Sequence, residues 1–124
     1  MIEVKNLSKQ FKAPTEEKGL FGPKKKAFWA VKDLDFEIKK GSVASILGPN
    51  GCGKTTTLRM IAGMLTPSKG TAFVDSVDVR KDKQTVKSKI GYMTNNTSLY
   101  DRLNVIETVK FFAELNQISP DVYM

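Results

Sequence analysis

Residues 48–55 read Gly-Pro-Asn-Gly-Cys-Gly-Lys-Thr, a complete G-x-x-x-x-G-K-[ST] pattern. Its glycines permit backbone angles and close approaches that a Cβ would block, so successive N–H groups can converge on phosphate oxygens. Lys54 can reach the β- and γ-phosphates of a nucleotide, the hydroxyl of Thr55 can ligate Mg²⁺, and Thr56 can bond the α-phosphate. The candidate nucleotide-binding residues of this loop are Gly48, Pro49, Asn50, Gly51, Cys52, Gly53, Lys54, Thr55 and Thr56.

Two elements must position this loop. Before it, residues 42–47 form a short apolar run with little alternation, which is typical of a central strand covered on both faces. After it, the sequence predicts a helix that opens near Lys54, with its positive dipole end toward the anion, and that Gly63 and the stretch 66–70 bring to an end. Four apolar residues recur at the i, i+3, i+4, i+7 spacing of one helix face: Leu58, Ile61, Ala62 and Leu65.

The first 40 residues predict antiparallel β-structure. Apolar and polar residues alternate over 2–5 and again over 33–39, which is the period of half-buried strands, and Lys40-Gly41 is expected to turn the chain. Between these strands, residues 12–27 are polar and lysine-rich, and glycine and proline interrupt them. This composition predicts an inserted basic loop.

Shorter elements are expected after residue 70. Residues 71–74 and 90–94 are strand candidates, and residues 82–89 suit a short polar helix. A last helix is predicted to begin after Asn104, because Glu107 three residues later completes a relaxed capping box. One face of that helix carries Val105, Val109 and Phe112.

Composition limits the remaining chemistry. The 124 residues include 20 Lys and Arg, 13 Asp and Glu, no histidine and one cysteine, with a net charge of +7. These counts exclude an internal disulfide, histidine-based metal sites and histidine-dependent nucleophilic catalysis within the chain. Apolar stretches such as 60–65 are far shorter than the roughly 20 residues that span a bilayer, and residues 1–11 do not resemble a signal peptide. A soluble, cytoplasmic protein is expected.

Much of the positive charge is local. Six lysines lie between Lys9 and Lys26, against Glu16 and Glu17. A run of this kind predicts a solvated loop, and contact with an anionic membrane surface is the alternative interpretation.

The sequence resembles the nucleotide-binding subunit of ABC transporters over essentially its whole length. The matching stretches are 4–11, 30–41, 46–63 and 65–70, followed by 90–94, 99–103 and Glu107 near the family's glutamine loop. Within the family it is most similar to the branch that includes sodium-exporter-type ATP-binding subunits. The resemblance implies an α/β P-loop NTPase fold of the ABC ATPase type, in which an antiparallel β portion leads into the central strand 43–47. It also implies ATP and Mg²⁺ as ligands.

Two further ligand contacts follow from the resemblance. Phe11 lies where the family places an aromatic that stacks on adenine; Phe28 and Trp29 compete for that role, and a core position at the end of the first strand is the alternative. Asn95 lies where the family has a glutamine that reaches Mg²⁺ and the attacking water. Asn is one methylene shorter, and a plain loop residue is the alternative interpretation.

The resemblance also implies partners. Tyr100 and Arg102 lie where such subunits contact a transmembrane permease, although an ordinary surface loop suits them equally. The implied function is ATP-driven membrane transport with that permease and a second ATP-binding subunit, at the cytoplasmic face of the membrane, with no nucleic acid. Two other functions stay open: a soluble ABC-type ATPase acting on nucleic acid or ribosomes, and a non-catalytic nucleotide-binding fragment.

Three family elements are missing from the sequence: an apolar strand ending in Asp-Glu, the Leu-Ser-Gly-Gly-Gln signature and the switch histidine. Asp75 and Asp78 are poor substitutes for the catalytic carboxylate, because their place after Gly70 predicts a peripheral hairpin. We therefore expect residues 1–124 to be one partial ABC ATP-binding domain, truncated before the catalytic carboxylate, that binds ATP without hydrolysing it.

Overall fold

The computed structural model describes residues 1–19, 22–94 and 102–122, with side chains outside the stretch 14–24. The chain divides into two compact units, Met1–Ile90 and Gly91–Met124, and each is described by itself. Within the described ranges, no helix combines the length and the apolar character that crossing a membrane requires.

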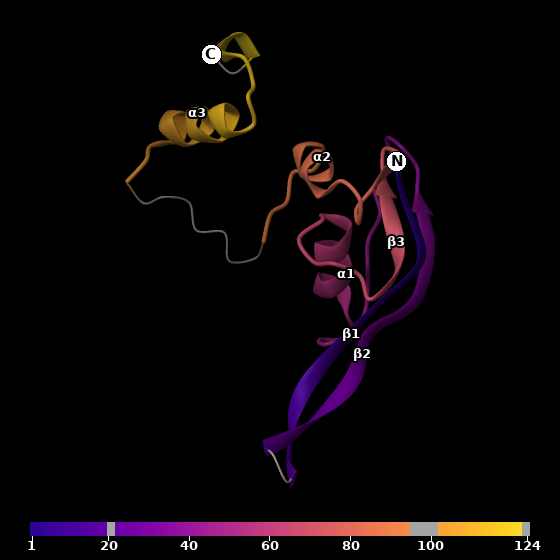
Figure 1. The fold of residues 1–124 in the computed structure, drawn as a ribbon. Coiled ribbons are helices and arrows are strands. Elements are labelled where there is room, and N and C mark those ends of the chain that lie inside the picture. Colours follow the sequence, from indigo (N-terminus) through magenta and orange to yellow (C-terminus); the bar gives the residue numbers. More distant parts are fainter. Residues whose placement is uncertain (20–21, 95–101, 123–124) are drawn as a thin grey trace. The chain divides into compact units, whose positions relative to one another are not determined.

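The first unit is built on a four-stranded sheet of order β2-β1-β3-β4 (Figure 1). Its strands are β1 (Ile2–Gly19), β2 (Gly22–Ile38), β3 (Lys69–Val74) and β4 (Val77–Asp78), and every pairing is antiparallel. Val4 lies opposite Phe36 on one side and opposite Ala72 on the other. Cross-strand neighbours share a face, so the predicted alternation presents an apolar row to the core. The strands expected over 2–5, 33–39 and 71–74 are confirmed.

Two helices, α1 (Lys54–Ile61) and α2 (Lys83–Ser88), cover one face of this sheet (Figure 1). The buried apolar residues between the helices and the sheet are Val4, Leu7, Val31, Met60, Ile61, Ala72, Val74, Val79 and Val86. The helix predicted after the loop is confirmed, but its buried face runs through Thr57, Met60 and Ile61. Leu58 is 45% exposed, so its place in the predicted apolar stripe is wrong.

The polar helix expected over 82–89 is confirmed as α2. Asp82 caps it, because the backbone N–H and the hydroxyl of Thr85 donate to its two carboxylate oxygens at 3.0 and 2.6 Å. These hydrogen bonds hold the pKa of Asp82 below its usual value, since they favour the charged carboxylate.

The inserted loop predicted over 12–27 is instead the outer part of β1 and β2. Lys12 pairs with Ala27 and Gly19 with Gly22, so the two arms form a hairpin. Because β3 pairs with β1 only as far as Ser8, residues 12–19 and 22–27 extend beyond the helices and the rest of the sheet (Figure 1). The prediction took proline and glycine as signs of a loop, but proline is also compatible with an edge strand. We call residues 12–19 and 22–27 the projecting hairpin.

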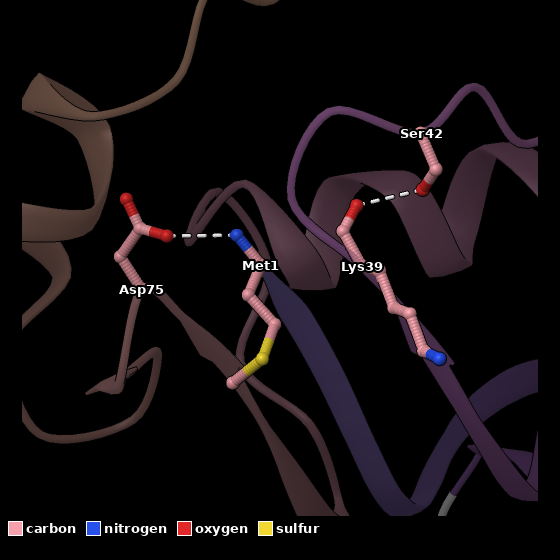
Figure 2. Close-up of polar contacts among 4 residues, drawn as sticks. All are labelled: Met1, Lys39, Ser42 and Asp75. Atoms are coloured by element: carbon pink, nitrogen blue, oxygen red, sulfur yellow. Dashed lines mark hydrogen bonds and ion pairs between the residues drawn. The ribbon is translucent and has the colours of Figure 1, made fainter.

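The central strand predicted over 43–47 is not formed. Ser42 closes the turn after β2 by donating its hydroxyl to the Lys39 carbonyl at 2.6 Å (Figure 2). Residues 43–47 then pair with none of the four described strands, and Val43 and Leu47 are 98% and 89% exposed. A strand needs ladder hydrogen bonds, and no described strand offers it a parallel edge. Residues 90–94 likewise form no strand, so that prediction is also wrong.

The second unit contains α3 (Val105–Leu115) and a 3₁₀ turn, Pro120–Val122. The capping box is complete, because Asn104 Oδ1 accepts the Glu107 N–H at 2.9 Å and Glu107 Oε2 accepts the Asn104 N–H at 2.8 Å. The predicted helix start is therefore confirmed. The expected apolar face of Val105, Val109 and Phe112 is exposed.

Candidate functional site

The loop 48–55 turns sharply into α1. The Pro49 carbonyl accepts the Cys52 N–H at 3.3 Å, and Thr57 N–H donates to the Gly53 carbonyl at 2.9 Å, which starts the helix. Gly53 is the N-cap residue and adopts a left-handed φ of 95°. Glycine tolerates this angle at no steric cost, so the loop can bend directly into the helix.

The amino-terminal end of α1 is open to an anion. No side chain caps this helix among the described residues, and its first turn contains no acidic residue. The N–H groups of the first helical turn have no acceptor within a helix, and they carry the positive end of the helix dipole. Lys54, Thr55 and Thr56 supply these N–H groups, and the Thr55 side chain is exposed. The arrangement suits phosphate oxygens and a hydrated cation.

Lys54 folds its side chain back over the loop. Its ammonium donates to the Gly48 carbonyl at 2.6 Å and the Pro49 carbonyl at 2.8 Å, and lies 3.8 Å from Cys52 Sγ. The contacts draw the start of the loop toward the start of the helix. They also keep a positive charge on the loop that leads into the uncapped helix, which adds to the attraction for an anion.

The loop is seated against β2. A Cβ added at Gly53 would meet the Ala30 carbonyl oxygen and would lie 2.9 Å from Val31 Cγ2. The pairing of β1 with β2 changes register here, because Lys9 pairs with Val31 whereas Gln10 pairs with Trp29. Ala30 is thus the extra residue of a β-bulge, a device that bends a strand and re-aims its groups. No spacing rule links residue 30 to residue 53, so the sequence did not predict the contact between Gly53 and Ala30.

Gly53→Ala should destabilise the first unit by more than Gly41→Ala does. Both glycines have a left-handed φ, 95° and 79°, but an added Cβ at Gly41 meets nothing within 4 Å. The angle alone costs a residue with a side chain about 1–2 kcal/mol, and Gly53→Ala adds the collision with backbone. Urea unfolding followed by circular dichroism measures both variants. Equal losses of unfolding free energy would show that the contact between Gly53 and β2 does not restrict the residue at position 53.

The three aromatic candidates divide between two faces of the β1–β2 ribbon. Phe11 lies opposite Phe28, with ring centroids 6.0 Å apart, whereas Trp29 lies opposite Gln10 on the other face. Val31 pairs with Lys9, which shares the face of Phe11 two residues away. Phe11 and Phe28 therefore lie on the face of the ribbon that meets Gly53.

Phe28 is 49% exposed, while Phe11 is half-buried and has the Lys9 ammonium 5.3 Å from its ring centroid. Either ring can offer apolar surface to a planar ligand near the loop.

The two acidic candidates are engaged elsewhere. Asp75 lies in the β3–β4 turn and Asp78 lies in β4, which confirms the expected hairpin. Asp75 accepts a hydrogen bond from the amino-terminal ammonium of Met1 at 2.7 Å (Figure 2). That hydrogen bond holds the pKa of Asp75 below its usual value. Burial alone would raise the pKa of Asp78, but hydrogen bonds from Thr71 Oγ1 at 2.6 Å and Arg80 N–H at 2.8 Å outweigh it and lower the pKa. Neither carboxylate makes a described contact with the loop.

Other predicted site residues fall outside this arrangement. Asn95 and Tyr100 lie outside the described residues, and Arg102 is exposed just before α3. The structure therefore joins the loop to the start of α1 and rests it on Ala30 of β2, two residues after Phe28.

The glycine-rich loop, the uncapped helix and the folded-back lysine define a P-loop protein of the α/β class. The family model described as "ABC transporter" matches residues 31–123. The chain therefore belongs to the ABC transporter family, as the sequence resemblance predicted.

Two curated relatives illustrate the similarity. ABC transporter ATP-binding protein NatA of Bacillus subtilis (strain 168) is 47% identical over 96 residues, which are 77% of this chain and 39% of NatA. Its similarity agrees with the sodium-exporter-type branch expected from the sequence. The probable multidrug ABC transporter ATP-binding protein YbhF of Escherichia coli (strain K12) is 34% identical over 113 residues, 91% of this chain and 17% of YbhF.

Among solved structures, the ATP-binding cassette MJ0796, a dimer bound to ADP and Pi, superposes with a TM-score of 0.76 at 25% identity. That match covers 99% of this chain and 52% of MJ0796. The chain thus spans between about a sixth and about half of the proteins compared here. The expected fold class, an ABC-type P-loop ATPase, is confirmed.

Proposed function

We propose that the chain binds MgATP through residues 48–56 and serves as the ATP-binding part of a membrane transporter. One observation carries the proposal: the amino terminus of α1 has no side-chain cap among the described residues, and the Lys54 ammonium is held over the preceding loop by the carbonyls of Gly48 and Pro49. The bound ADP and Pi of MJ0796 support the choice of ligand.

The residue roles follow from the loop. Backbone N–H groups from Gly51 to Thr56 would hold the phosphates, with Lys54 as the cation for the β- and γ-phosphates. The exposed Thr55 hydroxyl would hold Mg²⁺, and Asn95 is the proposed second contact to the metal and the attacking water. When bound, Mg²⁺ neutralises phosphate charge and polarises the oxygens it touches.

For the adenine base we propose Phe11, with Phe28 as its partner or replacement. The two rings share the ribbon face that meets Gly53, and this placement disfavours Trp29. Aromatic faces stack on planar bases, and this contact is not specific to one base.

For partners we propose a second ATP-binding subunit and a transmembrane permease at the cytoplasmic face of the membrane. The dimeric form of MJ0796 supports the first. Tyr100 and Arg102 are the proposed permease contacts, and residues 1–124 would fall within one ABC ATP-binding domain.

MgATP should slow maleimide labelling of Cys52. This exposed thiol is the chain's one cysteine and lies inside the loop, so a nucleotide seated there covers it. The measurement is the labelling rate by mass spectrometry with and without saturating MgATP. The Lys54→Ala variant serves as control, because its thiol should label at one rate under both conditions. Equal rates in the unmodified chain would place the nucleotide away from this loop.

A further inference from the structure

The projecting hairpin carries a concentrated positive charge. Residues 12–27 contain five lysines and two glutamates, a net charge of +3 out of +7 for the whole chain. Among the described strands its arms pair only with each other, so no other strand of the sheet lies along the outer edges of the hairpin. None of the hairpin side chains that the structure describes belongs to the apolar core of the first unit.

One face of the β1–β2 ribbon combines the charge of the projecting hairpin with an aromatic ring at its base. On β1, residues 10, 12 and 14 alternate onto this face, and their partners on β2 are residues 29, 27 and 25. Lys12, Lys25 and Trp29 therefore share it, and all three are exposed, Trp29 by 37%. Lys69 adds a third cation, because its ammonium lies 5.4 Å from the Trp29 ring centroid. We call Lys12, Lys25, Trp29 and Lys69 the basic-aromatic face.

The opposite face is the one proposed to meet the nucleotide. Phe11 and Phe28 lie there, together with Val31 beside the loop. The hairpin therefore separates the nucleotide side from the basic-aromatic face by the thickness of a two-stranded ribbon. A partner on the basic-aromatic face would not compete with a nucleotide at residues 48–56.

We propose that the basic-aromatic face binds the surface of an anionic lipid bilayer. Lysines near such a surface are attracted by its negative potential, and an indole is most favourable at the level of the lipid headgroups. The proposal rests on the transporter role, which keeps this unit within reach of the cytoplasmic leaflet. Lipid headgroups are therefore the anion that this surface meets at the highest local concentration.

Trp29 makes the proposal directly measurable, because it is the chain's one tryptophan. The purified 124-residue chain is mixed with vesicles of phosphatidylcholine, with or without phosphatidylglycerol, and both cosedimentation and tryptophan emission are recorded. We expect binding and a blue-shifted emission with phosphatidylglycerol vesicles only. High salt should reverse both, because it screens the lysines.

Lys12→Gln/Lys25→Gln should weaken vesicle binding by about 25-fold, since each lysine near an anionic surface contributes about a fivefold gain in binding. The matched control is Lys87→Gln/Lys89→Gln, which removes the same charge from exposed positions at the end of α2, outside the hairpin. The control should lose less than about threefold, because its lysines lie away from the face that contacts lipid. Circular dichroism verifies that both variants fold.

Three results would overturn the proposal: no sedimentation with phosphatidylglycerol vesicles, sedimentation without a shift in Trp29 emission, or equal losses in the two double variants. Binding to single-stranded RNA in place of these vesicles would also overturn it and would assign the face to nucleic acid. ATP binding is measured on the same samples. Lys54→Ala should lose ATP binding and retain vesicle binding. Failure of the proposed function would therefore appear as absent ATP binding, whereas failure of the lipid proposal would appear as absent vesicle binding.

Discussion

Lys54→Ala should abolish measurable ATP binding. The side chain carries the one cation whose contacts fix it within the loop, through the carbonyls of Gly48 and Pro49. Its removal takes away the charge that faces the β- and γ-phosphates, and charge-assisted hydrogen bonds are the strong ones. It also frees the start of the loop, so the backbone N–H groups lose part of their preorganisation. Together these losses should weaken binding by at least about 100-fold.

Isothermal titration of the purified chain with MgATP measures this change. Lys87→Ala is the matched control, because it removes an exposed lysine from α2 and leaves the loop intact. The control should bind as the unmodified chain does. Wild-type affinity in Lys54→Ala would mean that the nucleotide binds elsewhere and that residues 48–56 are not its site.

The 124-residue chain should not hydrolyse ATP by itself. Binding and hydrolysis use different parts of such a site, because the loop holds phosphates whereas other groups orient the attacking water and stabilise the transition-state charge. The sequence contains no histidine and no Asp-Glu pair that could end a strand beside the loop. Asp75 and Asp78 are held in the β3–β4 hairpin by Met1, Thr71 and Arg80.

Loss of positioned catalytic groups commonly costs several orders of magnitude in rate, so turnover should fall to background. The assay is phosphate release by the purified chain, with Lys54→Ala reporting any contaminating ATPase. Turnover near an ordinary enzymatic rate, roughly 1 s⁻¹, that disappears in Lys54→Ala would contradict the prediction. It would show that a carboxylate of this chain reaches the attacking water.

Much of the candidate site could be predicted because its information is local. The loop pattern spans eight residues, and the helix that follows begins at Lys54 as expected. The caps at Asp82 and Asn104 join residues three apart, and strand alternation depends on residues two apart. Contacts over such short separations can be predicted from sequence. Few other local arrangements give the same backbone N–H groups a hydrogen-bond partner or place the same apolar side chains on one face.

The predictions that failed depend on partners far away in the chain. Residues 43–47 have the composition of a central strand, but strand formation also needs a neighbouring edge, which the described strands do not offer. The stretch 12–27 has the composition of a loop, yet its arms satisfy each other's backbone groups and pair as strands. The composition of a segment shows which secondary structures it can adopt, whereas pairing with another strand decides whether it forms a β-strand.

The sequence by itself determined the glycine-rich loop pattern, the helix that follows it and the family to which both belong. Only the tertiary structure decided that Gly53 rests on Ala30 and that Phe11 and Phe28 share the ribbon face that meets Gly53. It also placed Trp29 with Lys12 and Lys25 on the opposite face. The reason is that one shift in strand register exchanges the faces of every side chain that follows, and register depends on both strands together.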